Sequence, residues 1–397
     1  MGDRPVILRP YGIVIDGELG IGLEIVRRNG RIETVRPHTG LPEPWVLSVP
    51  FVNAHSHFEY RGLQGRVPVP EPSREPEEPG HTFAAWIGAL TRAKAEQDPA
   101  QVEADVDRAA AENRATGVWA VGEHSDRPFS AAAMARHRLG GRVFQEVLTF
   151  FERNDPAPKV AAVRQKAESQ ATNGLPVHLS PHSLYTVDEG TLAELAQTDQ
   201  PISVHLAESR AENLFSTAGT GPIAETHRRN GFDPAPTGER VVARAERLGL
   251  LRPGAQLVHV CDIDPDEVAR IARSGASVAH CPRSNRTLRC PIAPIRELLD
   301  AGVPVGLGLD SPASSGPIDM FAEMRAALEL SRERGGPVAD REVWSMATTF
   351  GARSLMLPEP RIAAGCDGPL IRIAVPDAQC TEDLIERGSP GLVSWID

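Results

Sequence analysis

Residues 256–285 read QLVHVCDIDPDEVARIARSGASVAHCPRSN, and this stretch decides the fold. Short runs of apolar and β-branched residues, 256–260 and 276–279, are typical of strands buried on both faces. Between them a helix is predicted from Asp264, at the N-cap position, to Ser274, just before Gly275. The order strand, helix, strand predicts two parallel strands joined by a crossover helix.

The same alternation extends in both directions along the chain. Six further apolar runs are predicted to form strands, at 47–53, 118–121, 142–148, 176–179, 202–206 and 303–308. Helical segments lie between them, including 158–171, 188–197 and 292–301. Eight strands separated by helices favour an α/β fold, a closed parallel (β/α)8 barrel of the TIM type, over an open sheet.

Both ends of the chain depart from this pattern. Short strands around turns such as Asn29-Gly30 are predicted near the N-terminus, at Val6–Leu8, Ile13–Ile15, Leu23–Arg27 and Arg31–Val35. After Arg361 the clearest strand is Pro369–Val375. We therefore expect a small β-sandwich-like appendage built from both termini, residues 1–46 and 358–397, beside a barrel of residues 47–357.

The composition of the 397 residues argues against several classes of protein. With 42 Lys and Arg against 53 Asp and Glu, the net charge of −11 disfavours binding to nucleic acid or to an anionic membrane. No apolar run reaches membrane-spanning length, and the first residues lack the layout of a secretory signal. Five Cys without a CxxC pair indicate neither disulfides nor a thiolate zinc site, so a cytoplasmic protein is expected. A homo-oligomer is left open.

Residues 67–80, VPVPEPSREPEEPG, contain five Pro and four Glu and predict neither a helix nor a strand. Two interpretations stay open for this segment. It is either a solvated loop or a lid, because it follows the first barrel strand on the side where such barrels place active sites.

The histidines are placed in a pattern relative to the predicted strands. His55 and His57 lie two residues apart at the end of the first strand, so their side chains point to one face. Alone, this pair fits metal binding and packing about equally well. Other chemically active residues lie within a few residues of the carboxyl ends of five more strands: His182, His205, His259, His280 and Asp310. This shared placement favours a functional site at the carboxyl face of the barrel. His124, after the second strand, fits either interpretation.

Three imidazoles and one carboxylate are a suitable ligand set for Zn²⁺ or another borderline divalent ion with an open position for water. Such an ion lowers the pKa of bound water from 15.7 to about 7, which makes hydroxide available at neutral pH. Glu208, three residues after His205, is placed to carry the proton that this chemistry requires. A carboxylate in the first turn of a helix is the simpler interpretation of Glu208 taken alone.

Several segments together resemble the metal-dependent amidohydrolase superfamily. They are FVNAHSHFEYRGLQG (51–65), SPHSLYTV (180–187), VHLAES (204–209), HCPRSN (280–285) and GLGLDS (306–311). The series is most similar to the branch that deaminates aromatic rings, which includes cytosine, methylthioadenosine/adenosylhomocysteine and aminodeoxyfutalosine deaminases. The chain departs from the family at Leu309, where Thr is usual, which predicts the loss of a polar contact in that turn.

The resemblance implies a role for each residue of the site. One divalent metal ion, Zn first and Fe as the alternative, would be bound by four residues: His55, His57, His205 and Asp310. The catalytic residues would be Glu208, as the proton shuttle to a ring nitrogen, with His259 and Asp310 acting on the attacking water. Substrate contacts would come from His182, Trp86 and Asn285, although packing explains Trp86 equally well. His280 would shape the pocket rather than bind metal.

The number of metal ions follows from the lysines. Binuclear members of this superfamily bridge two metals with a carboxylated lysine on the fourth barrel strand. That region here, LPVHLSPHS (175–183), has no lysine, and the whole chain has only Lys94, Lys159 and Lys166. A mononuclear enzyme is therefore predicted.

The predicted activity is the deamination of an aromatic amino-substituted ring in a small nucleoside or nucleobase-like molecule. Metal-bound hydroxide would attack the ring carbon and ammonia would leave, with an aminodeoxyfutalosine- or adenosine-like substrate ranked first. The alternative is a hydrolase of another C–N or C–Cl bond, such as a chlorohydrolase or an amide or guanidine hydrolase. A catalytically inactive barrel used as a scaffold ranks last, because every expected ligand and Glu208 are present.

Overall fold

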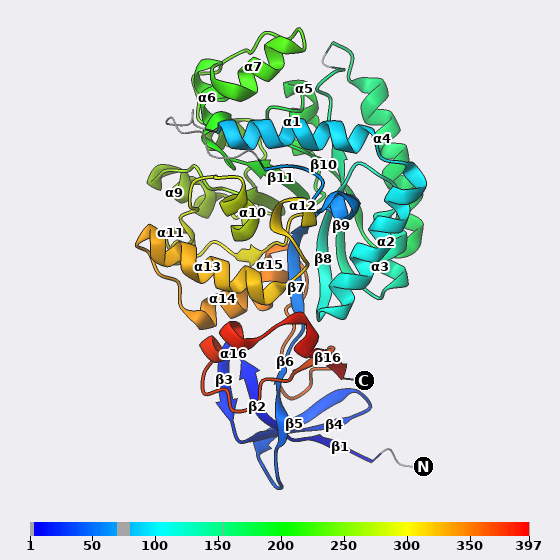
Figure 1. Ribbon diagram of the computed structural model, residues 1–397, viewed down its shortest axis with the longest axis vertical. Helices are drawn as coiled ribbons and strands as arrows, with labels where there is room; N and C mark the ends of the chain where they lie inside the picture. The colour runs from blue at the N-terminus through cyan, green and yellow to red at the C-terminus, as the bar shows by residue number, and fades with distance from the viewer. Residues whose placement is uncertain (1–3, 70–79, 153, 397) are drawn as a thin grey trace.

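The centre of the molecule is a closed barrel of eight parallel strands, seen in a computed structural model that describes residues 4–69, 80–152 and 154–396 (Figure 1). The strands are β7 (Phe51–Ser56), β8 (Val118–Ser125), β9 (Gly140–Val147), β10 (Val177–Pro181), β11 (Ile202–Leu206), β12 (Ala255–His259), β13 (Ser277–His280) and β14 (Val305–Leu307). Two arcs, β10-β9-β8-β7 and β11-β12-β13-β14, are joined by parallel bridges from Ser56 to Asp310 and from Ser183 to His205. The predicted (β/α)8 barrel is confirmed.

The quoted stretch folds as its sequence predicts. Helix α9 (Pro265–Ser274) lies between β12 and β13, and the Asp264 side chain accepts a hydrogen bond from the backbone N–H of Glu267 at 2.9 Å. Gly275 ends the helix with a φ of 73°, a left-handed conformation that glycine adopts without strain. Local capping signals are therefore sufficient to place this helix.

The first predicted strand is wrong in its boundaries. Residues 47–53 cover the end of one strand, β6 (Glu43–Ser48), and the start of another, β7, with Val49 and Pro50 between them. Pro50 has no N–H to donate, so it interrupts the hydrogen-bond ladder at this point. Because β6 pairs with β2 and β15 rather than with barrel strands, its final residues belong to the appendage sheet.

The appendage consists of two sheets built from both ends of the chain, as predicted. One sheet contains β1 (Val6–Leu8), β4 (Leu23–Arg28) and β5 (Arg31–Pro37); the other has the order β16-β15-β6-β2-β3, with β16 (Val393–Ile396), β15 (Leu370–Ile373), β2 (Pro10–Ile15) and β3 (Glu18–Ile21). Ile13, Ile25, Trp45 and Leu370 are buried in one cluster between the sheets. Strands β3 and β16 were not among the predicted strands.

Helices surround the barrel on its outside (Figure 1). They are α2 (Pro99–Ala115), α3 (Ser130–Arg136), α4 (Ala157–Gln170), α5 (Glu189–Ala196), α6 (Arg210–Ala218), α7 (Gly221–Arg229), α8 (Val241–Arg247), α11 (Ile295–Asp300), α13 (Met320–Arg334), α14 (Asp340–Met346) and α15 (Thr349–Ser354), while α16 (Thr381–Arg387) packs beside α13 and α14. No helix in the described ranges is long and apolar enough to span a membrane.

Short elements at the carboxyl end of the barrel position the site. A 3-10 helix, η1 (Phe58–Leu63), follows β7, while α10 (Pro282–Thr287) follows β13 and α12 (Pro312–Ser315) follows β14. Helix α1 (His81–Ala95) crosses this end of the molecule, and the appendage lies at the opposite end (Figure 1). Of the loop 67–80 that was predicted as a possible lid, residues 70–79 lie outside the described residues, so that prediction stays open.

Candidate metal centre and active-site pocket

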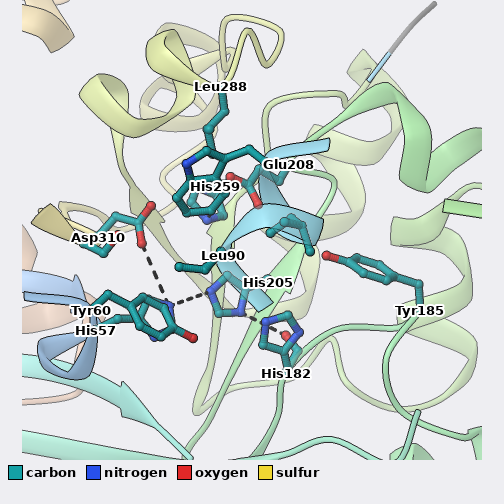
Figure 2. A pocket seen from close by; sticks show the side chains of 13 residues that line it. His57, Tyr60, Leu90, His182, Tyr185, His205, Glu208, His259, Leu288 and Asp310 are labelled. Carbon is teal, nitrogen blue, oxygen red and sulfur yellow. Dashed lines mark hydrogen bonds and ion pairs between the residues drawn. The ribbon is translucent and has the colours of Figure 1, made fainter. Parts of the chain in front are cut away.

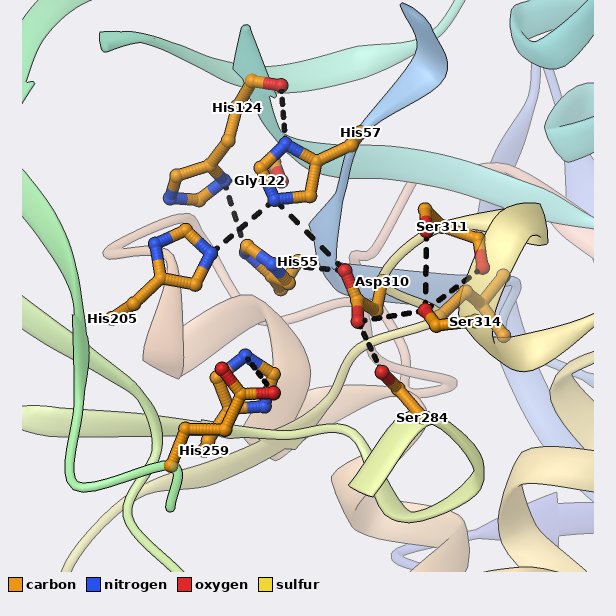
Figure 3. A network of polar contacts seen from close by, with 12 residues as sticks. His55, His57, Gly122, His124, His205, His259, Ser284, Asp310, Ser311 and Ser314 are labelled. Carbon is orange, nitrogen blue, oxygen red and sulfur yellow. Dashed lines mark hydrogen bonds and ion pairs between the residues drawn. The ribbon is translucent and has the colours of Figure 1, made fainter. Parts of the chain in front are cut away.

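The four predicted metal ligands meet at the carboxyl end of the barrel (Figure 3). His55 and His57 come from the end of β7, His205 from β11, and Asp310 from the turn after β14. Two backbone hydrogen bonds join the first and last strands here, from Asp310 N–H to His55 O at 2.9 Å and from His57 N–H to Asp310 O at 3.0 Å. Closure of the barrel thus brings together residues that lie about 250 positions apart.

The imidazole nitrogens are arranged to receive a cation. His57 Nδ1 lies 3.1 Å from the carbonyl of His124, and His205 Nδ1 lies 3.0 Å from the carbonyl of His182. A carbonyl only accepts, so each Nδ1 carries the proton and each Nε2 presents a lone pair. Those two Nε2 atoms lie 3.3 Å apart. Two facing lone pairs at this distance require a positive charge beside them, which a divalent metal ion supplies.

The positions of Asp310 Oδ1 and His55 Nε2 also fit a metal site. Asp310 Oδ1 is 3.6 Å from His55 Nε2 and 3.9 Å from His57 Nε2. His55 Nε2 is buried and has no hydrogen-bond partner among the described residues. Nitrogen and carboxylate donors in this combination suit zinc.

Burial sets the protonation of these ligands. It lowers the pKa of His55, His57 and His205, so all three imidazoles are neutral at pH 7, the form that binds metal. For Asp310, burial alone would raise the pKa, but His57, His259 and the hydroxyl of Ser284 lower it below its usual value. Asp310 is therefore an anion, the form in which a carboxylate binds metal.

Hydroxyl and amide groups hold Asp310 in place. The Ser284 hydroxyl and Ser314 Oγ, the latter at 3.1 Å, both donate to Asp310 Oδ2, which leaves Oδ1 facing the imidazoles (Figure 3). The Leu309 side chain is buried, and its backbone N–H donates to Asn53 Oδ1 at 2.9 Å. Asn53 from β7 therefore anchors the turn that presents Asp310.

Glu208 and His259 face each other beside the ligand set. Glu208 Oε1 lies 3.5 Å from His259 Nε2, and the Asn285 side-chain amide contacts His259 Nδ1 at 3.0 Å. Burial, then the charges of Asp310 and Glu212, raise the pKa of Glu208 well above its usual value. Burial lowers the pKa of His259 to about 3. Burial thus favours the protonated form of Glu208 next to a neutral His259 imidazole.

A tight turn fixes the position of Glu208. The Glu212 carboxylate accepts hydrogen bonds from three consecutive backbone N–H groups, those of Ala207, Glu208 and Ser209, at 3.0, 2.7 and 3.2 Å. These hydrogen bonds are part of a capping box at the start of α6. They turn the chain so that the Glu208 side chain points into the pocket and not into solvent.

The predicted ligands lie at the base of a pocket (Figure 2). Its walls are formed by His57, Tyr60, Trp86, Ile87, Leu90, His182, Tyr185, His205, Glu208, His259, Leu288, Asp310 and Ser311. The predicted substrate contacts His182 and Trp86 are among them. Asn285, predicted with those two, does not line the pocket and reaches it only through His259. His280 is buried at the end of β13 and does not line the pocket either.

The structure assigns two residues that the sequence left without a role. His124 Nδ1 lies 3.1 Å from His55 Nδ1, and its carbonyl contacts His57, so His124 packs against two of the predicted ligands. Glu146, at the end of β9, is fully buried with its Oε1 3.9 Å from His205 Nδ1, and it is close enough to His57 and His205 for all three to share a cation. An acidic residue at the carboxyl end of a barrel strand was the available signal for Glu146.

Comparison with known proteins agrees with this site. The chain matches the amidohydrolase family over residues 48–386. It is 30% identical over 308 residues to 5-methylthioadenosine/S-adenosylhomocysteine deaminase of Natronomonas pharaonis, covering 74% of this chain and 68% of the relative. It is 30% identical over 352 residues to aminodeoxyfutalosine deaminase of Deinococcus radiodurans, covering 81% and 76%. An adenosine deaminase structure from Xanthomonas campestris with bound zinc has a TM-score of 0.79 at 22% identity, covering 98% of this chain and 90% of that one.

These matches and the site geometry define a metal-dependent hydrolase with a histidine-rich metal site. The chain belongs to the amidohydrolase family, since the match spans most of its length. The predicted resemblance to the deaminase branch is confirmed, because the relatives named above are deaminases.

Proposed function

We propose that the protein is a mononuclear aminohydrolase that removes the amino group from an aromatic ring of a small nucleoside or nucleobase-like molecule. An aminodeoxyfutalosine- or adenosine-like substrate ranks first, because the relatives at 30% identity bear such names. A pocket inside the carboxyl end of the barrel and a net charge of −11 favour a small molecule over nucleic acid. The observation that carries the proposal is Glu208, a buried acid in the wall of this pocket.

His55, His57, His205 and Asp310 would hold one metal ion, with zinc preferred for this donor set. Such an ion supplies Lewis acidity, which makes a water molecule nucleophilic near neutral pH. A single ion is favoured because the fourth strand, β10, has no lysine, and Lys94, Lys159 and Lys166 all lie on helices.

The residues of the chain move the protons of the reaction. As the hydroxyl of water joins the ring carbon, its proton passes to Asp310 Oδ1, the oxygen that no hydroxyl group occupies. Glu208 gives its proton to the adjacent ring nitrogen, which neutralises the charge that develops there. The amine then leaves as ammonia with the proton from Asp310, and Glu208 recovers a proton from the new hydroxyl group. Each such transfer contributes roughly 10²–10⁴ to the rate.

His259 orients Glu208 for these proton transfers. Its Nε2 faces Glu208 Oε1, and the Asn285 amide holds the other side of the ring. Because the ring is neutral at pH 7, it orients the acid without competing for its proton. Departure of halide would need no proton, so the presence of Glu208 supports release of an amine over release of chloride.

An ammonia-release screen tests the proposal. Zinc-loaded protein is offered aminated purines, pyrimidines and their nucleosides, and ammonia should appear with at least one of them. Glu208→Gln should keep its zinc and lose about 10²–10⁴ in rate. Glu194→Gln, at an exposed position on α5, is the matched control and should leave turnover unchanged.

Two results would reject the proposed function. Retained turnover in the Glu208→Gln variant would remove this residue from the proton route. No ammonia from the whole panel, combined with hydrolysis of an amide or a carbon–chlorine bond, would instead favour the second class of hydrolase.

A further inference from the structure

Lys94, in the last turn of α1, is a partly buried lysine that the deamination chemistry does not use. Its Nζ lies 2.6 Å from Glu59 Oε1 and 3.2 Å from Asp126 Oδ2, and it donates to the hydroxyl of Tyr60 at 3.0 Å. A lysine ammonium has three N–H donors, so these three oxygens satisfy all of them. The side chain is 17% exposed.

The partners of Lys94 belong to the barrel, not to α1. Glu59 and Tyr60 lie in η1, two and three residues after the predicted ligand His57, and the Tyr60 ring stacks on His57 with ring centroids 4.9 Å apart (Figure 2). Asp126 directly follows β8, and the hydroxyl of Ser125 donates to Glu59. Lys94 therefore joins the end of α1 to the segment that carries two of the metal ligands.

The same face of α1 forms the wall of the pocket. Trp86, Leu90 and Lys94 are spaced four residues apart, which places them along one side of the helix. Trp86 and Leu90 line the pocket, whereas Lys94 lies beyond its edge. At the other end of α1, Gly80 packs so closely on α6 that a Cβ there would lie 2.6 Å from the Cβ of Ala211. Helix α1 is thus fastened at both ends, with the pocket residues between.

The anchor at Lys94 is electrostatic. Burial alone would lower the pKa of Lys94, but Glu59, Tyr60 and Asp126 raise it well above its usual value, so the side chain is a cation. Lifting the C-terminal end of α1 would leave the Glu59 carboxylate, itself 1% exposed, without its cation. Since an unpaired buried charge is strongly unfavourable, the ion pair opposes this movement.

We propose that Lys94 is a positioning residue that fixes the C-terminal end of α1 to the turn after His57, and so holds Trp86 and Leu90 against the substrate. Its kinetic consequence rests on the proposed function, whereas its effect on α1 does not. Loss of the anchor should weaken substrate binding more than it slows the chemical steps, because the metal ligands and Glu208 come from other elements.

Hydrogen–deuterium exchange on the full-length, zinc-loaded protein tests the anchor directly. In Lys94→Met, amides of residues 81–95 should exchange at least about tenfold faster, because a buried ion pair has been broken. Barrel strands and zinc content should be unchanged. Lys159→Met, in an exposed ion pair with Glu152 on the outside of the barrel, is the matched control and should behave as the original protein.

Kinetics with the substrate found in the ammonia screen complete the test. KM should rise at least about tenfold with kcat within about threefold, as expected for lost binding contacts. Unchanged exchange in α1 would overturn the proposal, as would faster exchange throughout the barrel, or a fall in kcat with KM unchanged. If α1 opens but no substrate is deaminated, the anchor stands and the proposed function fails.

A second variant covers the case in which Lys94→Met does not fold. The double variant Glu59→Gln/Lys94→Met removes both charges, so no carboxylate is left buried without its cation. It should again show faster exchange in residues 81–95 with stable barrel strands. Exchange in α1 equal to that of the original protein would overturn the role of the ion pair.

Discussion

Replacing Gly308 by alanine is expected to displace His55 and weaken metal binding. Gly308 directly follows β14 and packs against β7. A Cβ at this position would lie 2.7 Å from the Cβ of His55, 3.0 Å from the His55 backbone nitrogen and 2.9 Å from the Sγ of Cys281. Two of these three atoms belong to His55, which is itself a predicted metal ligand.

The size of the effect follows from these distances. Carbon atoms pack at about 3.5–4.0 Å, so His55 and Gly308 must separate by close to 1 Å. The His55 backbone is tied to Asp310 by a hydrogen bond, so the ligand pair is distorted as it separates. Metal–ligand distances tolerate changes of about 0.2 Å. We therefore expect at least about a hundredfold loss of zinc affinity, beyond the 10–100-fold typical of changes outside the ligands.

Competition with a chelator of known zinc affinity, followed by elemental analysis, measures this loss. Overpacking should also destabilise the apoprotein by about 1–3 kcal/mol in urea unfolding. Gly368→Ala is the matched control, because no atom lies within 4 Å of the added Cβ. Zinc affinity equal to that of the original protein in Gly308→Ala would refute the reasoning that this close approach sets the ligand geometry.

Two further predictions concern buried polar groups. Asn53→Ala removes the acceptor for Leu309 N–H and the donor to Asn113 Oδ1, and should cost about 2–5 kcal/mol in urea unfolding; a change below about 0.5 kcal/mol would contradict this. Burial raises the pKa of Glu323 to about 8, so the folded protein keeps a proton that the unfolded chain releases near 4.5. The free energy of unfolding should therefore fall by up to about 5 kcal/mol as pH rises from about 4.5 to 8. Glu323→Gln should remove this part of the pH dependence. The same pH dependence of the free energy of unfolding in both proteins would contradict the prediction.

Much of the barrel could be predicted from the sequence because its signals are local. In residues 256–285 the apolar runs, the Asp264 cap and Gly275 mark β12, α9 and β13 without reference to the rest of the chain. The boundary between β6 and β7 could not be predicted in this way. Both segments are apolar, and only pairing with different sheets separates Ser48 from Phe51.

That the four predicted ligands lie close together could also be predicted from the sequence, because barrel topology converts a position at a strand end into a position in space. His55, His57, His205 and Asp310 each lie at such an end, and closure of the barrel brings them together. The sequence could not show which nitrogen of His57 and of His205 faces the candidate metal position. That is decided by the carbonyls of His124 and His182, which belong to other strands.

The sequence by itself determined the fold class, the candidate ligands and, through the absence of lysine from the fourth strand, the expectation of one metal ion. Only the tertiary structure decided that the pKa of Glu208 lies well above its usual value, since this depends on its burial and on Asp310 and Glu212 nearby. It also decided that Lys94 contacts Glu59, Tyr60 and Asp126. Burial and charge pairing depend on distances between residues far apart in the chain, and those distances exist only once the barrel has closed.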